Sequence, residues 1–144
     1  MATDQLDIDG LAALTDTRKS NYPSAPDGLR VGHVHLRVGD IAMAESFYRG
    51  TIGLDPARRR DGASFLSSGR YHHHVAMNVW QSAGAGRRDD AAKGLVSFSL
   101  EVEKQDLFAA QEERLRQAGA GVTSLTNGFE TSDPWGTRIR IVKV

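Results

Sequence analysis

The hydrophobic pattern of the chain runs twice through the same order of elements, and this repeat constrains the fold more than any other feature. From Val31, apolar and polar residues alternate as in a half-buried strand, and Asp40 then caps a predicted helix that ends at Gly53. Three further strand patterns follow, over residues 54–60, 63–67 and 71–80, separated by turn dipeptides. The first half of the chain therefore predicts a strand, a helix and three strands.

The same order begins again after a polar, glycine-bearing connection at residues 81–93. Alternation over 96–102 predicts a strand, a helical stripe covers 104–118, and strand patterns follow at 122–125, 129–131 and 137–144. Val38 and Val102 end the matching strands. Each sheet would bury one face under its helix and leave the other face to line a ligand site. We predict an α+β domain at residues 30–144, in which two βαβββ modules, at about 30–80 and 93–144, form a cup-shaped cleft.

Residues 1–29 are predicted to be an N-terminal extension and linker. Leu6, Ile8, Leu11 and Leu14 permit one or two amphipathic helical turns, and a partly ordered terminus is the simpler alternative. Proline, serine and glycine between Ser20 and Gly28 are typical of a linker.

Composition excludes several classes of function. The 18 basic and 18 acidic residues cancel, so no net field attracts nucleic acid or an anionic membrane, and no apolar run is long enough to span a bilayer. The sequence contains no phosphate-binding glycine loop and no nucleophile elbow. Because there is no cysteine, any metal would be held by nitrogen or oxygen ligands. These features predict a cytoplasmic protein that binds a small molecule, and neither nucleic acid nor a membrane.

All five histidines fall in two short segments, and this clustering marks the candidate site. Residues two apart on a strand share a face, so His33 is predicted to point with His35 and His72 with His74, while His73 points to the opposite face. Converging imidazoles suit a divalent metal such as Fe, Mn or Zn, or supply a general base. The alternative is that they are hydrogen-bonded wall residues or solvated side chains.

Three segments resemble a known family. Gly32-His33-Val34-His35-Leu36-Arg37-Val38, the Phe47-Tyr48 pair and Ile52-Gly53-Leu54 are similar to the opening of a vicinal oxygen chelate module. That superfamily includes glyoxalase I, bleomycin resistance proteins and extradiol dioxygenases. Residues 71–80 and the glycines after them resemble the catechol 2,3-dioxygenase-like subgroup, and the leader resembles the segment that joins the halves of longer members. The resemblance implies a free-standing C-terminal half with the paired-module fold, whose enzymes hold a divalent metal in the cup.

The resemblance also implies where the metal ligands would lie. Its usual His, His and Glu fall at His33, Ser97 and Arg140, so the triad is incomplete and one position carries a permanent cation. We therefore expect any metal at a displaced site, with His33 and His74 as ligands; the alternatives are His35 in place of His33 and His72 in place of His74, with Glu101 as a further ligand. The predicted pocket uses neutral residues to orient a ligand and Arg138 and Arg140 to pair with an anion. Its residues are His35, His72, Asn78, Ser97, Glu101, Arg138 and Arg140.

Three functions remain open from the sequence. The first is a superfamily domain that binds a small aromatic or anionic molecule in its cup, for which the family implies a metal-dependent dioxygenase or lyase. The second is a metal-free binding or resistance-type protein. The third is a non-catalytic structural half that pairs with itself, as a homodimer, or with a partner half-chain.

Overall fold

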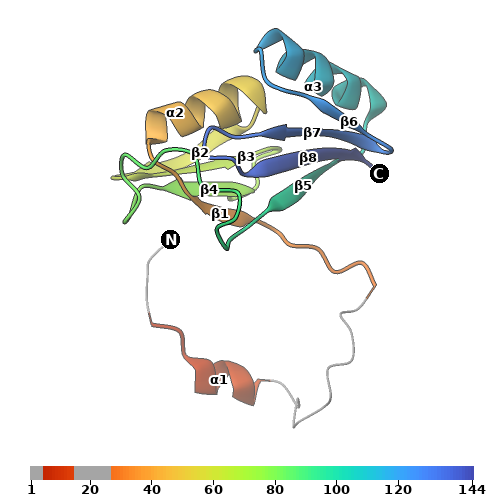
Figure 1. Cartoon of the computed structure of the whole chain (residues 1–144). Helices are drawn as coiled ribbons and strands as arrows, with labels where there is room; N and C mark the ends of the chain where they lie inside the picture. The colour runs from red at the N-terminus through yellow and green to blue at the C-terminus, as the bar shows by residue number, and fades with distance from the viewer. Residues whose placement is uncertain (1–4, 15–26) are drawn as a thin grey trace. The chain divides into compact units, whose positions relative to one another are not determined.

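We analysed a computed structural model of the chain, which describes residues 5–14 and 27–144 (Figure 1). The chain divides into two units, Met1–Val31 and Gly32–Val144. In the first unit, helix α1 (Ile8–Ala13) begins after Asp7, whose side chain accepts a hydrogen bond from the Gly10 backbone N–H at 2.9 Å. Of the two alternatives for this segment, the structure has the short helix. Most of the predicted linker, including Ser20 and Pro23, lies outside the described residues.

The second unit contains the predicted repeat. Its two four-stranded sheets have matching orders, β1-β4-β3-β2 and β5-β8-β7-β6. In each sheet the first strand pairs in parallel with the last strand of its module, and the other pairs are antiparallel. The first module comprises β1 (Val34–Arg37), α2 (Ile41–Glu45), the π-helix η1 (Ser46–Thr51), β2 (Asp55–Arg60), β3 (Ala63–Ser67) and β4 (Val75–Asn78). The second comprises β5 (Ser97–Val102), α3 (Gln105–Gln117), β6 (Thr123–Leu125), β7 (Gly128–Ser132) and β8 (Arg138–Lys143). The α+β prediction is confirmed.

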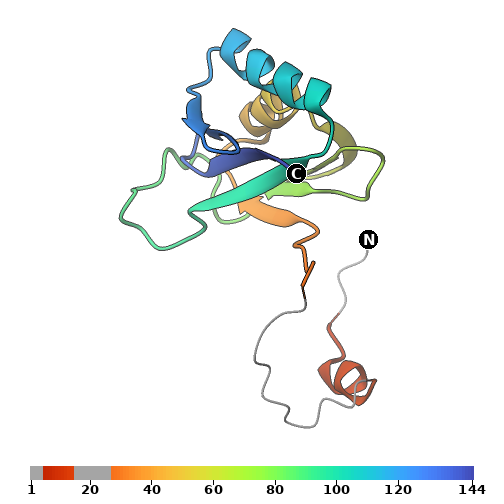
Figure 2. The ribbon, with the colours of Figure 1, turned by 90° about the vertical axis from the view of Figure 1, so that its right-hand side faces the viewer.

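Helices α2 and α3 cover the same side of the strands, which leaves the opposite side of the sheets without a helix (Figures 1 and 2). Strand alternation decides which residues face the helices: Leu36 and Val38 are buried, whereas His35 and Arg37 between them are exposed. The larger apolar core crosses both modules, since Leu36 belongs to the same cluster as Ile139 and Ile141 on β8 and Leu115 on α3. A smaller buried cluster, Ala63, Phe65 and Ala76, lies on the first sheet.

Two local features differ from the expected elements. The first helix is α-helical only from Ile41 to Glu45 and continues as the π-helix η1, which ends before Gly53 in the left-handed conformation at φ 85°. The fourth strand begins at Val75, not at Tyr71. Gly69 and Arg70 both have positive φ, at 64° and 63°, so the chain bends between β3 and β4 and the residues after the bend are not yet in a strand.

The connection at residues 81–93 is a surface segment without helix or strand, as predicted. Trp135 packs against it: this turn residue is 7% exposed, and its indole N–H donates to the carbonyl oxygen of Ala85 at 2.8 Å. The tryptophan is therefore a packed turn residue. No helix in the described ranges, 5–14 and 27–144, has the length and apolar character needed to cross a bilayer.

Candidate functional site

The uncovered face of the second sheet carries an arginine pair. Arg138 and Arg140 alternate along β8 with the buried Ile139 and Ile141, so their side chains leave the core on the face away from the helices. Register places Arg138 beside Ser97 and Arg140 beside Ser99 on β5. The predicted pocket residues Ser97, Arg138 and Arg140 thus share one region of this face.

Glu130 on β7 engages both arginines. The Nε of Arg140 donates to its Oε2 at 2.8 Å, and Nη1 of Arg138 lies 3.7 Å from its Oε1. The Glu130 side chain is only 15% exposed, while each arginine side chain is 43% exposed. Sequence reasoning missed this glutamate, because its position opposite Arg140 depends on the register between β7 and β8.

The position implied for a family carboxylate ligand is therefore occupied by a guanidinium that already has a carboxylate partner. A guanidinium has no lone pair to donate, and its permanent charge repels a divalent ion. Ser97 offers only a neutral hydroxyl at the second position. His33, Ser97 and Arg140 therefore do not fit a divalent metal.

Four imidazoles gather at the edge of the first module. The ring centroids of His33 and His73 are 4.4 Å apart, those of His72 and His73 4.5 Å, and those of His33 and His72 5.4 Å. His35 joins them, with its Nε2 3.1 Å from the Nε2 of His73. We call His33, His35, His72 and His73 the histidine cluster.

The bend between β3 and β4 brings these side chains together. His33 precedes β1 and the His74 carbonyl accepts from the Val34 N–H at 2.9 Å, so the two histidine segments run side by side. The sequence prediction that His73 points away from its neighbours is wrong. Strict alternation applies only inside a strand, and residues 71–73 lie in the bent segment before β4.

Burial and repulsion between neighbouring imidazoles lower the pKa values of two histidines of this cluster. The pKa of His73, which is 2% exposed, is lowered to about 4, first by burial and then by the neighbouring His33, His72 and His35. Burial, followed by repulsion from His33, also lowers the pKa of His35. Both imidazoles are therefore neutral at pH 7 and present a lone pair.

His74, which was predicted to be a metal ligand, is not among the histidines that lie close enough together to share a metal ion. Among the residues described, His33, His72 and His73 bring three imidazole nitrogens within 4.8 Å of one another, and His74 is not in that group. The Nδ1 of His74 instead accepts a hydrogen bond from the Ser68 backbone N–H at 3.1 Å. Of the predicted metal pair, His33 belongs to the group, and the geometry puts His72 and His73 beside it.

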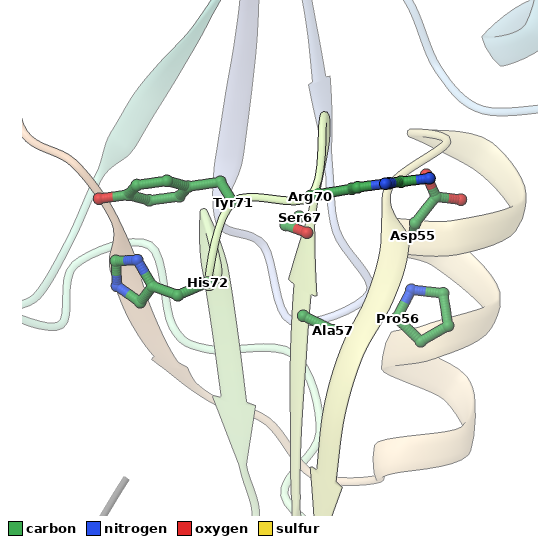
Figure 3. Close-up of a pocket in the computed structure, with 7 residues that line it drawn as sticks. All are labelled: Asp55, Pro56, Ala57, Ser67, Arg70, Tyr71 and His72. Carbon is green, nitrogen blue, oxygen red and sulfur yellow. The ribbon is translucent and has the colours of Figure 1, made fainter.

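A pocket of about 370 Å³ lies beside the cluster (Figure 3). Figure 3 shows the Arg70 side chain extending towards Asp55, while Tyr71 and His72 point away from them. The Tyr71 ring centroid lies 4.2 Å from that of His72, and the tyrosine is 42% exposed. The pocket thus has a charged end and an aromatic end. Its lining is Asp55, Pro56, Ala57, Ser67, Arg70, Tyr71 and His72.

The predicted pocket residues are distributed over more than one place. His72 lines this pocket, whereas Arg138, Arg140 and Ser97 lie on the second sheet. Asn78 ends β4, and its side-chain oxygen accepts from the Trp80 N–H at 3.1 Å. Glu101 is an exposed residue of β5. Sequence reasoning missed Arg70 and Tyr71, which the Ser68-Gly69 turn signal places at the start of the bend.

Comparison with known proteins agrees with the repeated topology. The sequence model of the Glyoxalase/Bleomycin resistance protein/Dioxygenase superfamily matches residues 30–141. The chain belongs to this superfamily. It is 32% identical over 136 residues to a catechol-2,3-dioxygenase of Bacillus subtilis (strain 168), a match that covers 93% of this chain and 47% of that protein. The chain thus spans about half the length of that relative.

Solved structures of the superfamily have the same fold. A lactoylglutathione lyase from Agrobacterium tumefaciens is similar at a TM-score of 0.59 and 19% identity, over 83% of this chain and 96% of that one. A glyoxylase/bleomycin resistance protein/dioxygenase domain from Frankia sp. EAN1pec is similar at a TM-score of 0.59 and 24% identity, over 80% of this chain and 97% of that one. At these identities the likeness establishes the fold.

Proposed function

We propose that this domain binds a small aromatic molecule carrying a phenol or carboxylate group, in the pocket beside the histidine cluster. The observation that carries the proposal is the pocket lining, which joins an aromatic end at Tyr71 and His72 to a charged end at Arg70 and Asp55. Its volume of about 370 Å³ suits a single-ring compound, since small-molecule sites measure roughly 300–1,000 Å³.

Four of the lining residues have a defined part in binding. The Tyr71 ring, together with His72, offers an aromatic surface on which a ring stacks. The Arg70 guanidinium donates hydrogen bonds to a carboxylate or phenolate, and the Asp55 carboxylate accepts from a hydroxyl. Because Asp55 repels a second negative charge, the pocket favours a monoanion or a neutral diol over a dianion. A catechol, the compound class in the name of the Bacillus subtilis relative, meets these requirements.

The arginine pair on the second sheet is the competing anion site, and its contacts weigh against it. Glu130 already accepts a hydrogen bond from Arg140 and lies close to Arg138, so much of their charge is neutralised. A ligand carboxylate there would have to displace Glu130 or approach its charge. We therefore assign the ligand to the pocket at Tyr71 and His72 and infer a binding role that needs no metal at the family positions.

Calorimetric titration of the metal-free protein with catechol and with benzoate, in EDTA, tests the proposal. We expect saturable binding that Arg70→Ala weakens about tenfold for benzoate, which corresponds to about 1.4 kcal/mol. Tyr71→Ala should weaken both probes, and Arg140→Ala serves as the matched control that leaves both unchanged. Absence of binding up to a large excess of either probe would refute the proposal. Loss in Arg140→Ala with no effect of Arg70→Ala would place the site on the second sheet instead.

A further inference from the structure

Three residues of the histidine cluster have the composition of a metal centre. Only one of them, His33, lies at a ligand position that the superfamily implies, because the other two such positions are Ser97 and Arg140. Three imidazole nitrogens, from His33, His72 and His73, lie within 4.8 Å of one another. We propose that these three histidines bind a divalent transition-metal ion, Zn²⁺ foremost, so that the metal is displaced from the strands of the second module to the bend between β3 and β4. His33 is the ligand common to both positions, while Ser97 and Arg140 take no part.

The donor set selects the class of ion. Neutral imidazole suits Zn²⁺, Cu²⁺, Ni²⁺ or Fe²⁺, whereas Mg²⁺ and Ca²⁺ take oxygen ligands. Zn–N bonds of about 2.0–2.1 Å put tetrahedral ligand nitrogens roughly 3.3 Å apart. His33 and His72 are exposed side chains, and small rotations of their rings close the remaining distance. Zn²⁺ held by three imidazoles keeps a fourth position for water or an anion.

His73 supplies an independent observation. Its side chain is 2% exposed, and its Nδ1 makes no hydrogen bond of good geometry among the residues that the structure describes; its one further polar contact is a weaker one with the His72 backbone, which acts to raise the pKa of His73. A buried polar atom left without a partner is costly and uncommon in a folded protein. A metal ion ligated by Nδ1 would give this buried atom a full partner.

The other nitrogen of His73 already has the contact that a ligating imidazole needs. Its Nε2 lies 3.1 Å from the Nε2 of His35. When Nδ1 binds the metal, Nε2 carries the proton and donates it to His35, which fixes the tautomer and the ring orientation. His35 is thus a positioning residue for His73 and not a ligand.

The charge of this centre connects it with the neighbouring pocket. Three neutral imidazoles leave the full double charge of the ion uncompensated, so an anionic fourth ligand is favoured. His72 belongs both to the metal group and to the pocket lining, which places the ion at the pocket border. The identity of that fourth ligand as a phenolate or carboxylate rests on the proposed function, whereas metal binding itself does not.

The test is metal retention by untagged full-length protein. After removal of metal with EDTA, the protein is incubated with Zn²⁺ alone and desalted, and Zn²⁺ is quantified and its affinity measured by competition with a chromogenic chelator. We expect close to one equivalent, and a tetrahedral visible spectrum when Co²⁺ replaces Zn²⁺. His72→Asn, at an exposed position, should weaken Zn²⁺ binding more than 100-fold. His35→Gln should weaken it roughly 10- to 100-fold at unchanged stoichiometry, as expected for the partner of a ligand.

Matched variants locate the site. His74→Asn lies in the same histidine run but outside the group, and should retain Zn²⁺ like the unmodified protein. Ser97→Ala should also retain it, because the family position is not used. The proposal is overturned if the unmodified protein keeps no metal, if His72→Asn binds normally, or if Ser97→Ala loses the ion. Catechol binding in EDTA is measured separately, so failure of the pocket proposal and failure of the metal proposal are distinguishable.

Discussion

Replacing Tyr48 with phenylalanine is expected to weaken the junction between the two modules. Tyr48 lies in η1 of the first module and is fully buried. Its hydroxyl donates to the Oδ2 of Asp133 at 2.9 Å, in the last turn of the second module. The other oxygen of that carboxylate accepts from the backbone N–H groups of Trp135, at 3.0 Å, and Thr137, at 2.8 Å. Tyr48→Phe thus removes a single donor from a buried carboxylate.

The size of the effect follows from that environment. A hydrogen bond to a charged group contributes about 1.5–3 kcal/mol, and loss of one partner leaves the other less well satisfied in the interior. The substitution deletes one oxygen and opens almost no cavity, so the polar term dominates. We expect the free energy of unfolding at pH 7 to fall by about 2 kcal/mol.

Alkaline pH provides a second readout of the same contact. Burial, then the Asp133 charge and the hydrogen bond to it, raise the pKa of Tyr48 well above 10. Between the unfolded pKa near 10 and the higher folded value, the unfolded chain has lost this proton and the folded chain keeps it. The unfolded state then binds fewer protons, so stability decreases as pH rises above 10. Tyr48→Phe should lack this contribution.

Urea unfolding at pH 7 and pH 10.5, followed by circular dichroism, measures both effects. Tyr71→Phe, at the 42% exposed tyrosine, is the matched control and should behave like the unmodified protein in both series. A cost of less than about 0.5 kcal/mol for Tyr48→Phe at pH 7 would contradict the expected role of this hydrogen bond. So would a decline in the stability of the variant between the two pH values as steep as that of the unmodified protein.

Three further predictions concern acid pH, the arginine pair and the long connection. As pH falls from 6.5 to about 4, His73 becomes protonated in the unfolded chain but not in the folded metal-free protein, so the free energy of unfolding should fall by up to about 3 kcal/mol. Urea unfolding in EDTA at a series of pH values should show a smaller decrease for His73→Gln. Glu130→Gln should cost under about 1 kcal/mol, because each arginine it faces is 43% exposed, and thermal melts in low and high salt measure it. Trp135→Phe loses the bond to the Ala85 carbonyl and should cost about 1 kcal/mol, with faster limited proteolysis within residues 81–93 as the readout.

The repeated order of elements and the alternation of apolar and polar residues on the strands could be predicted from the sequence, because both depend on local periodicity. Leu36 and Val38 alternate with His35 and Arg37, and this pattern correctly predicted which face of β1 is buried. The helix starting at Asp40 was also predictable, since its carboxylate accepts from the Met43 N–H at 2.6 Å as an N-cap does. These features need only neighbours along the chain.

The assembly of the site depends on contacts that local patterns do not encode. Sequence alone showed that the histidines cluster and that Ser97 and Arg140 stand at the implied ligand positions. Only the tertiary structure decided that the bend at Gly69 and Arg70 turns His72 and His73 together towards His33, and that Glu130 holds Arg140. A turn with positive φ interrupts strand alternation, and ion pairs across strands depend on register. The turn conformation and the strand register are both set only when the sheets form. The sequence therefore determined which functional side chains are available, and the tertiary structure decided which of them lie close together.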